Sequence, residues 1–173
     1  GWNSKALKKL NPLGQVPTLI LPDGSVMTES AAIILHLADR VPGYALVPAP
    51  GNAKRDKFLR WLLFLVSAVY PTFTYGDVTE RWVGAGHKDG AGKAPREGTD
   101  EHRKALWRFF ETQIEGPWFL GKAVSALDLY VWMMLKWRPG AEWFKAEAPK
   151  LHRIGMAMND HPVCKKVTAR NRL

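Results

Sequence analysis

The chain has 173 residues, 46% of them hydrophobic, which is enough to bury a core in one large domain or in one domain and a smaller unit. Its net charge is +9, but the basic residues are scattered and accompany no recognised nucleic-acid motif, so we expect a solvated basic surface and no nucleic-acid or membrane partner. One cysteine excludes an internal disulfide framework and fits a reducing, cytoplasmic location, and no apolar run reaches the roughly 18 residues of a membrane span.

The beginning of the chain predicts a helix and a β-hairpin. Ser4 can cap a short helix that ends at Asn11-Pro12. Val16–Leu21 is a short apolar run rich in β-forming residues, and Ser25–Met27 is a second one. Pro22-Asp23-Gly24 lies between them with the chemistry of a tight turn, which joins the two runs as a hairpin.

A helix then opens at Thr28 or Glu29, with Thr28 as its expected cap. Residues 44–52 hold prolines and a glycine without periodicity, which is typical of a linker. We therefore expect two units, an α/β unit at 1–43 and an all-α domain at 53–173.

Helical patterns fill the second unit, and its many aromatic residues are expected to pack between helices. Ala53–Tyr70 is apolar on all sides in its middle and predicts a buried core helix, which Pro71 ends or kinks. The glycine-rich residues 84–98 predict a loop. Further helical segments are expected at Phe73–Val83, Asp100–Ile114, Ala126–Trp137 and Ala141–Met158, the last divided at Pro149.

Two local patterns stand out in the first unit. Pro17 follows Val16 where a strand begins, a place at which proline is tolerated because it has no N–H for the sheet. On local sequence alone a trans peptide is the commoner state here, since only about 5–6% of such bonds are cis. The second pattern is Glu29-Ser30 at a helix start, where an acidic residue in the first turn already suits the helix dipole.

Glu29 and Ser30 also have the chemistry of a binding site. The N–H groups of a helix N-terminus bind a carboxylate, and the Ser30 hydroxyl adds a donor. The Glu29 carboxylate can accept hydrogen bonds from an ammonium group. An α-amino acid moiety, such as the γ-glutamyl end of glutathione, carries both charges on one carbon.

These patterns together resemble the bacterial type of cytosolic glutathione transferase. The resemblance rests on the segments Asn11–Leu19 and Glu29–Ile33, followed by Trp118–Gly121 and the Ser125-x-x-Asp128 capping box. It implies a thioredoxin-like α/β domain, present here mostly as a hairpin with helices, and an all-α helical-bundle domain. It also implies that the chain begins after the first strand and helix of that family.

The resemblance assigns site residues by position. In thioredoxin-like folds the residue before a cis-proline, here Val16, offers its backbone to a peptide ligand, which favours a cis peptide in this context. Glu29 and Ser30 would hold the γ-glutamyl group. The glutathione-binding set is Lys8, Gln15, Val16, Pro17, Glu29 and Ser30. Lys8 or Lys9, with Trp2 as a further candidate, would meet the glycine carboxylate, and for both lysines a solvated surface is at least an equal alternative.

An acceptor pocket is expected between the domains, lined by Tyr70, Phe73 and Tyr75, with core packing as the alternative for each. The implied activity is conjugation of the glutathione thiolate to small electrophiles, a detoxification reaction, by a homodimer with glutathione as cosubstrate. The Ser, Tyr or Cys that activates the thiol is expected upstream, so the catalytic residue is unknown. The alternatives are a non-catalytic transferase-like binding or assembly module, and a Cys-type thiol transferase. The histidines show no metal-ligand spacing.

Overall fold

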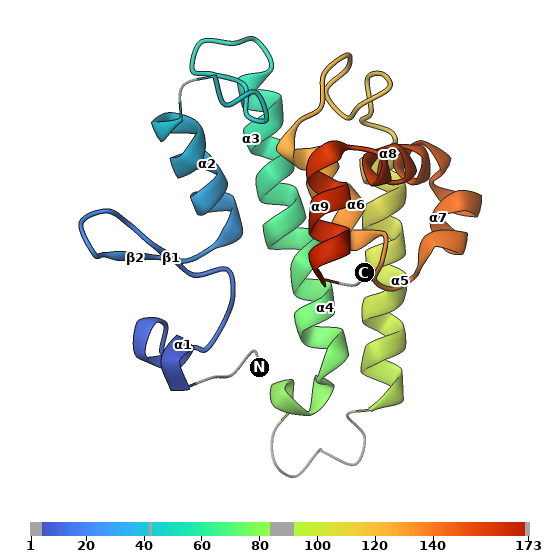
Figure 1. Ribbon diagram of the computed structural model, residues 1–173. Helices are drawn as coiled ribbons and strands as arrows, with labels where there is room; N and C mark the ends of the chain where they lie inside the picture. Colours follow the sequence, from blue (N-terminus) through green and yellow to red (C-terminus); the bar gives the residue numbers. More distant parts are fainter. Residues whose placement is uncertain (1–4, 42, 84–91, 172–173) are drawn as a thin grey trace.

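The computed structural model describes residues 5–41, 43–83 and 92–171, and it confirms the predicted order of a small α/β unit followed by helices. Figure 1 shows the α/β unit beside the long helices of the second part, with α2 next to α3. The expected cap at Ser4 lies outside the described residues, as do positions 84–91 of the predicted glycine-rich loop.

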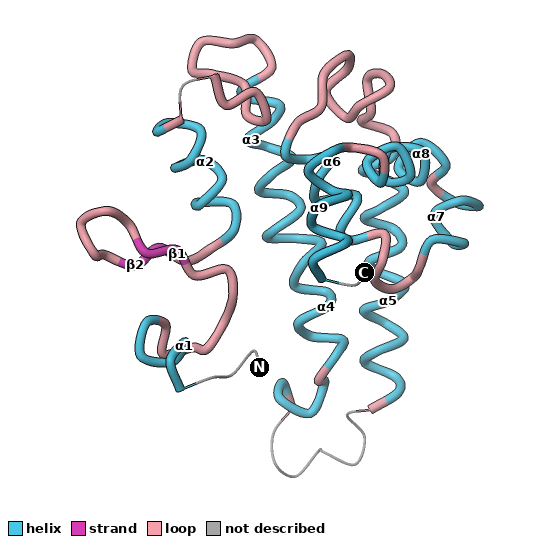
Figure 2. The backbone as a smooth tube through the Cα atoms, in the orientation of Figure 1, coloured by secondary structure: helices cyan, strands magenta, loops and turns pink. Residues whose placement is uncertain are grey.

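The α/β unit consists of α1 (Lys5–Leu10), β1 (Leu19–Ile20), β2 (Val26–Met27) and α2 (Ser30–Arg40). The strands pair antiparallel, with Leu19 opposite Met27 and Ile20 opposite Val26. Figure 2 shows the long connection from α1 that precedes this hairpin. The first strand is shorter than the predicted run Val16–Leu21, because within the described residues only β2 lies beside it to accept and donate ladder hydrogen bonds.

The predicted turn at residues 22–24 is confirmed. The N–H of Gly24 donates to the carbonyl of Leu21 at 2.9 Å, and the N–H of Leu21 donates to the carbonyl of Ser25 at 2.8 Å. Asp23 Oδ1 accepts from the N–H and the hydroxyl of Ser25, at 2.9 and 2.6 Å. Gly24 has a φ of 84°, a conformation that glycine adopts without steric cost.

The second part opens with one long helical segment made of α3 (Arg55–Phe64), the π-turn η1 (Leu65–Val69) and α4 (Tyr70–Asp77). We expected Pro71 to end or kink the helix, and the structure continues through it. The N–H of Tyr70 reaches back to the carbonyl of Leu65, so the π-turn ends where Tyr70 begins α4, and Pro71 lies in the first turn of α4. Proline has no N–H to donate, so the helix lacks one backbone hydrogen bond at Pro71, and the π-turn lies directly before it.

The segment Arg55–Asp77 is also long and apolar enough, by length and composition, to cross a membrane. A core helix passes the same test, and the side chains of this segment identify it as one. Five of them are no more than 1% exposed, namely Phe58, Trp61, Leu62, Leu65 and Val69. The expectation of a buried core helix is therefore confirmed.

The remaining helices are η2 (Thr79–Trp82), α5 (Lys93–Glu111), α6 (Ala126–Met134), α7 (Ala141–Glu147), α8 (Pro149–Asn159) and α9 (Pro162–Asn171). The predicted break at Pro149 and the predicted Ser125–Asp128 capping box are both confirmed. We had not predicted α9. The loop prediction is wrong for residues 93–98, because Pro95 lies in the first turn of α5, where the N–H groups have no helical partner.

A single cluster of buried side chains joins the two parts. It contains the fully buried rings of Trp61, Trp107, Phe110 and Phe119, which confirms the predicted aromatic packing between helices. Ala31 of α2 belongs to the same cluster. The α/β unit therefore shares its core with the helical bundle, and α2 is fixed against it.

Candidate functional site

The loop that carries Val16-Pro17 is organised by the buried side chain of Asn11, which is 5% exposed. Asn11 Nδ2 donates to the carbonyl of Gln15 at 2.9 Å and to Thr18 Oγ1 at 3.3 Å. Its Oδ1 accepts from the N–H of Leu13 at 3.1 Å. One amide thus ties both sides of the loop together and fixes the path of the chain up to Val16.

The backbone of Val16 is available for pairing. The Val16–Pro17 peptide is cis, as the family resemblance implied, and Val16 is 49% exposed. Its N–H and C=O have no hydrogen-bond partner among the residues that the structure describes. The carbonyl of Gln15 is already occupied by Asn11 and by the Thr18 hydroxyl. Val16 therefore presents the donor and acceptor to which an extended peptide could add as a strand.

Glu29 stands directly before α2 with φ 66° and ψ 108°, a conformation that side-chain-bearing residues rarely adopt. The sequence predicted Thr28 as the cap, but Glu29 itself occupies the cap position and no side chain caps the helix. A residue held in such a region costs about 1–3 kcal/mol and persists where the surroundings or the function require it. The exposed Glu29 side chain is left free for a ligand.

We expect Glu29→Gly to be about 1 kcal/mol more stable than Glu29→Ala, because glycine alone relieves the strained φ. Both variants lack the carboxylate, so both should lose ligand affinity to the same extent. Urea denaturation of the two proteins measures the first effect. Equal unfolding midpoints would show that the Glu29 backbone stores no strain.

Ser30 is the first residue of α2, and its hydroxyl oxygen lies 2.6 Å from the hydroxyl oxygen of Tyr130 in α6. The site therefore sits where the α/β unit meets the helical bundle. Burial raises the pKa of Tyr130, the hydrogen bond with Ser30 opposes that rise, and the charges of Tyr70 and Glu29 add to it. The free N–H groups of the first turn of α2 complete a site suited to a carboxylate beside an ammonium group.

The three aromatic residues expected to line an acceptor pocket do not lie together. Tyr70 and Phe73 form one cluster with Trp137, with ring centroids 5.5 and 5.1 Å from that of the tryptophan. Phe73 is 6% exposed and packs in the core, whereas Tyr70 is half-buried and lies close enough to affect Tyr130. Tyr75 is 47% exposed and packs against Trp82 instead, with the two ring centroids 4.7 Å apart.

The remaining candidates are the basic residues at the end of α1. Lys8 and Lys9 occupy its last turn, and both are exposed. Neither makes an ion pair among the described residues, which is compatible with ligand binding and with a solvated surface alike. Trp2 lies outside the described residues. In the described part of the chain, no group of three or more His, Cys, Asp or Glu side chains could hold a metal ion.

Reasoning from the sequence missed two residues of this region. From the sequence we assigned Asn11 the end of a helix and a place in the segment that carries the resemblance, but no role in the site, although a buried asparagine within a proline- and glycine-containing loop can bond several backbone groups at once. We had treated the segment around Tyr130 only as an apolar core helix. A lone tyrosine in such a helix is a usable signal, because a buried hydroxyl normally finds a partner.

Comparisons with known proteins identify the family of this chain. Residues 1–40 match the family model of the glutathione S-transferase N-terminal domain. The chain is 38% identical over 174 residues to the uncharacterized GST-like protein YncG of Escherichia coli K12, covering 100% of this chain and 82% of YncG. It is 30% identical over 131 residues to the glutathione S-transferase GstA of Escherichia coli O157:H7, covering 74% of this chain and 59% of GstA.

A solved structure has the same architecture. The sphingomonad glutathione S-transferase complexed with glutathione superposes with a TM-score of 0.77 at 25% identity, over 98% of this chain and 80% of that one. The thioredoxin-like unit followed by an all-α domain is therefore the fold of this protein. With this fold and the match along the whole chain to YncG, the chain belongs to the glutathione S-transferase superfamily.

Proposed function

We propose that this protein binds glutathione as a cosubstrate. The observation that supports the proposal is that Glu29 and Ser30 are adjacent at the N-terminus of α2, with the Glu29 side chain exposed. The α-ammonium of the γ-glutamyl group would donate to Glu29, and its α-carboxylate would accept from Ser30 and from the first N–H groups of the helix. The exposed backbone of Val16 would pair with the cysteinyl residue.

We further propose that the bound thiol is transferred to a small electrophile. Hydrogen bonding to the sulfur lowers the pKa of a thiol, and the thiolate is the nucleophile. In the family the activating Ser, Tyr or Cys belongs to the first strand–helix junction, and we assign that role to no residue of this chain. Half-buried Tyr70 is our candidate contact for the acceptor, with Phe73 packing behind it. Family membership supports a homodimer, a cytoplasmic location, a detoxifying role and domain limits at 1–43 and 53–173.

The test is a paired substitution at the proposed γ-glutamyl site. We expect Glu29→Ala with Ser30→Ala to weaken glutathione binding on the order of 30-fold, because two charge-assisted hydrogen bonds are lost. Calorimetric titration of the full-length protein with glutathione measures the change. As a matched control, Asp39→Ala removes an exposed carboxylate from the far end of the same helix and should leave the affinity unchanged.

Unchanged affinity in the double variant would rule out the site. Conjugation is tested separately, with an aromatic halide as the electrophile. Tight glutathione binding without conjugation would favour a binding or assembly module over a transferase, and reduction of mixed disulfides would favour a Cys-type enzyme.

A further inference from the structure

Tyr130 connects the helical bundle to the proposed γ-glutamyl site. It is 5% exposed, and its hydroxyl contacts that of Ser30, a residue 100 positions earlier in the chain. Among the described residues, the Tyr130 hydroxyl makes no other hydrogen bond. The contact thus joins the first turn of α2 to α6 through two hydroxyl groups.

The direction of this hydrogen bond determines what Ser30 can do. A hydroxyl has one hydrogen to donate and lone pairs with which to accept. If Ser30 donates to Tyr130, no Ser30 hydrogen remains for a ligand. If Tyr130 donates to Ser30, the Ser30 hydrogen is free to point at a ligand oxygen. At 2.6 Å the contact suits either direction, and a bound carboxylate, which only accepts, selects the second.

Tyr130 is well suited to be the donor. Burial raises the pKa of its hydroxyl, and the negative charge of Glu29 beside it raises that pKa further, so the hydrogen stays in place at neutral pH. Loss of that hydrogen would place a second negative charge next to the one that Glu29 already brings to the site.

We propose that Tyr130 is a positioning residue that turns the Ser30 hydroxyl toward the α-carboxylate of the γ-glutamyl group. The inference rests on the proposed function and extends it, because a residue of the helical bundle then sets the affinity of a site built on the α/β unit. In the chain from Tyr130 to Ser30 to the carboxylate, each hydrogen bond polarises the next. The arrangement favours ligands with an acceptor at this point.

The experiment is a double-mutant cycle read with two ligands. Tyr130→Phe, Ser30→Ala and their combination are titrated with glutathione and with its 4-aminobutyryl analogue, which keeps the amine and lacks the α-carboxylate. We expect Tyr130→Phe to weaken glutathione binding about fivefold to tenfold, as for loss of a hydrogen bond that supports a charged group. With the analogue, and in the Ser30→Ala background, the same change should have less than about a twofold effect.

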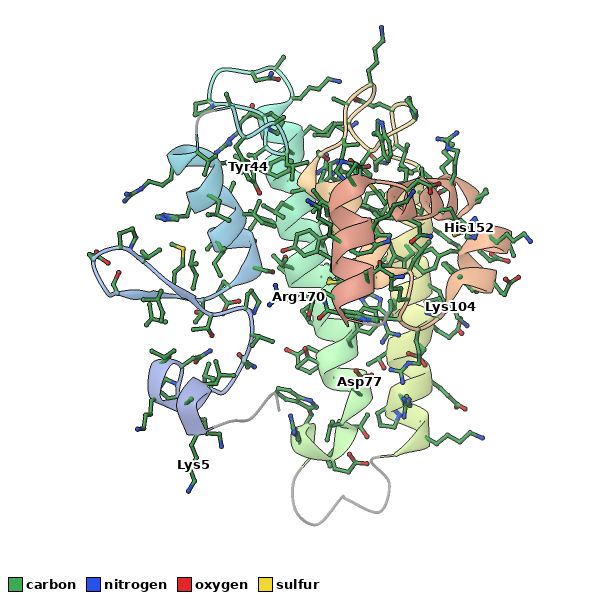
Figure 3. The ribbon with its side chains drawn as sticks, viewed as in Figure 1. Lys5, Tyr44, Asp77, Lys104, His152 and Arg170 are labelled. Atoms are coloured by element: carbon green, nitrogen blue, oxygen red, sulfur yellow. The ribbon has the colours of Figure 1, made fainter. Side chains whose placement is uncertain are left out.

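Tyr44→Phe is the matched control. Tyr44 lies at the other end of α2, near α3, and its hydroxyl makes no hydrogen bond among the described residues, so its removal should not change either affinity (Figure 3). The inference would be overturned if Tyr130→Phe weakened the binding of both ligands equally, if it weakened glutathione binding equally in the Ser30→Ala background, or if it left glutathione binding unchanged. If the wild-type protein fails to bind glutathione, the proposed function is wrong as well. If the wild type binds and Tyr130→Phe leaves the affinity unchanged, only the positioning role is wrong.

Discussion

Replacing Arg103 with methionine is expected to lower the free energy of unfolding by about 3–5 kcal/mol, the cost of breaking a buried ion pair from one side. Arg103 is fully buried between α4 and α5. Its Nε and Nη2 donate to the hydroxyl and carbonyl of Thr72 at 2.7 and 2.9 Å, and its Nη1 donates to Asp100 at 2.7 Å. Its guanidinium also lies 3.8 Å from the ring centroid of Phe73.

The surroundings of Arg103 explain why a hydrophobic replacement does not compensate. Burial lowers the pKa of Arg103 and the carboxylate of Asp100 opposes that shift, so the charge is retained at neutral pH. Methionine fills part of the volume but removes the donors to the Thr72 hydroxyl and carbonyl, and it leaves Asp100 with only the more distant Arg138 Nε, at 3.4 Å. Because Asp100 is 26% exposed and can recover water, we expect the loss to fall at the lower end of the range.

Guanidinium denaturation measures the lost free energy of unfolding, and two further variants serve as comparisons. Arg108→Met, on the same helix, breaks an ion pair with Glu147 in which both side chains are nearly half exposed, so it should cost less than about 1 kcal/mol. Arg103→Lys keeps the charge without the planar fork and should fall between the two. Similar losses for the two methionine variants would show that the buried network does not stabilise the α4–α5 contact.

Local signals explain which parts of the fold could be predicted. The turn at Asp23, the break at Pro149 and the capping box at Ser125 each depend on residues a few positions apart, so the sequence contains them in full. The helix does not end at Pro71, and the π-turn directly before that proline could not be predicted from the proline alone. Arg103 could not be placed at all, since a single arginine in a charged helix looks like a solvated residue until α4 packs over it.

The same distinction holds within the candidate site. Glu29 and Ser30 are adjacent and follow a helix-start pattern, so they could be named from the sequence. The strained φ of Glu29 could not, because the sequence offered Thr28 as an ordinary cap. Tyr130 reaches Ser30 only once the chain is folded, because the two residues are 100 positions apart, and no pattern of neighbouring residues records that contact. The sequence therefore indicated Glu29 and Ser30 at the start of α2 and did not indicate Tyr130, which the helical bundle contributes.

The second large effect is expected at Asp128, where alanine should lower the free energy of unfolding by about 3 kcal/mol or more. The carboxylate is fully buried and accepts three hydrogen bonds. They come from the N–H of Phe119 at 2.8 Å and from the N–H and hydroxyl of Ser125 at 2.8 and 2.9 Å. Alanine leaves two buried N–H groups without an acceptor and removes the Asp128 half of the capping box of α6.

The pH dependence of this loss separates the carboxylate from the cavity that alanine leaves. Burial raises the pKa of Asp128 in the folded protein, and the bonds from Phe119 and Ser125 only partly oppose the rise. The folded state therefore binds the proton more tightly than the unfolded state, and the carboxyl group stabilises more as the pH falls. The difference in free energy of unfolding between the wild type and Asp128→Ala should be constant near neutral pH. It should grow as the pH drops through the raised pKa toward the ordinary value of about 3.9. Asp39→Ala, at an exposed position, should shift the free energy of unfolding by less than about 0.5 kcal/mol near neutral pH. A difference between wild type and Asp128→Ala that shrinks in acid would contradict the raised pKa of Asp128.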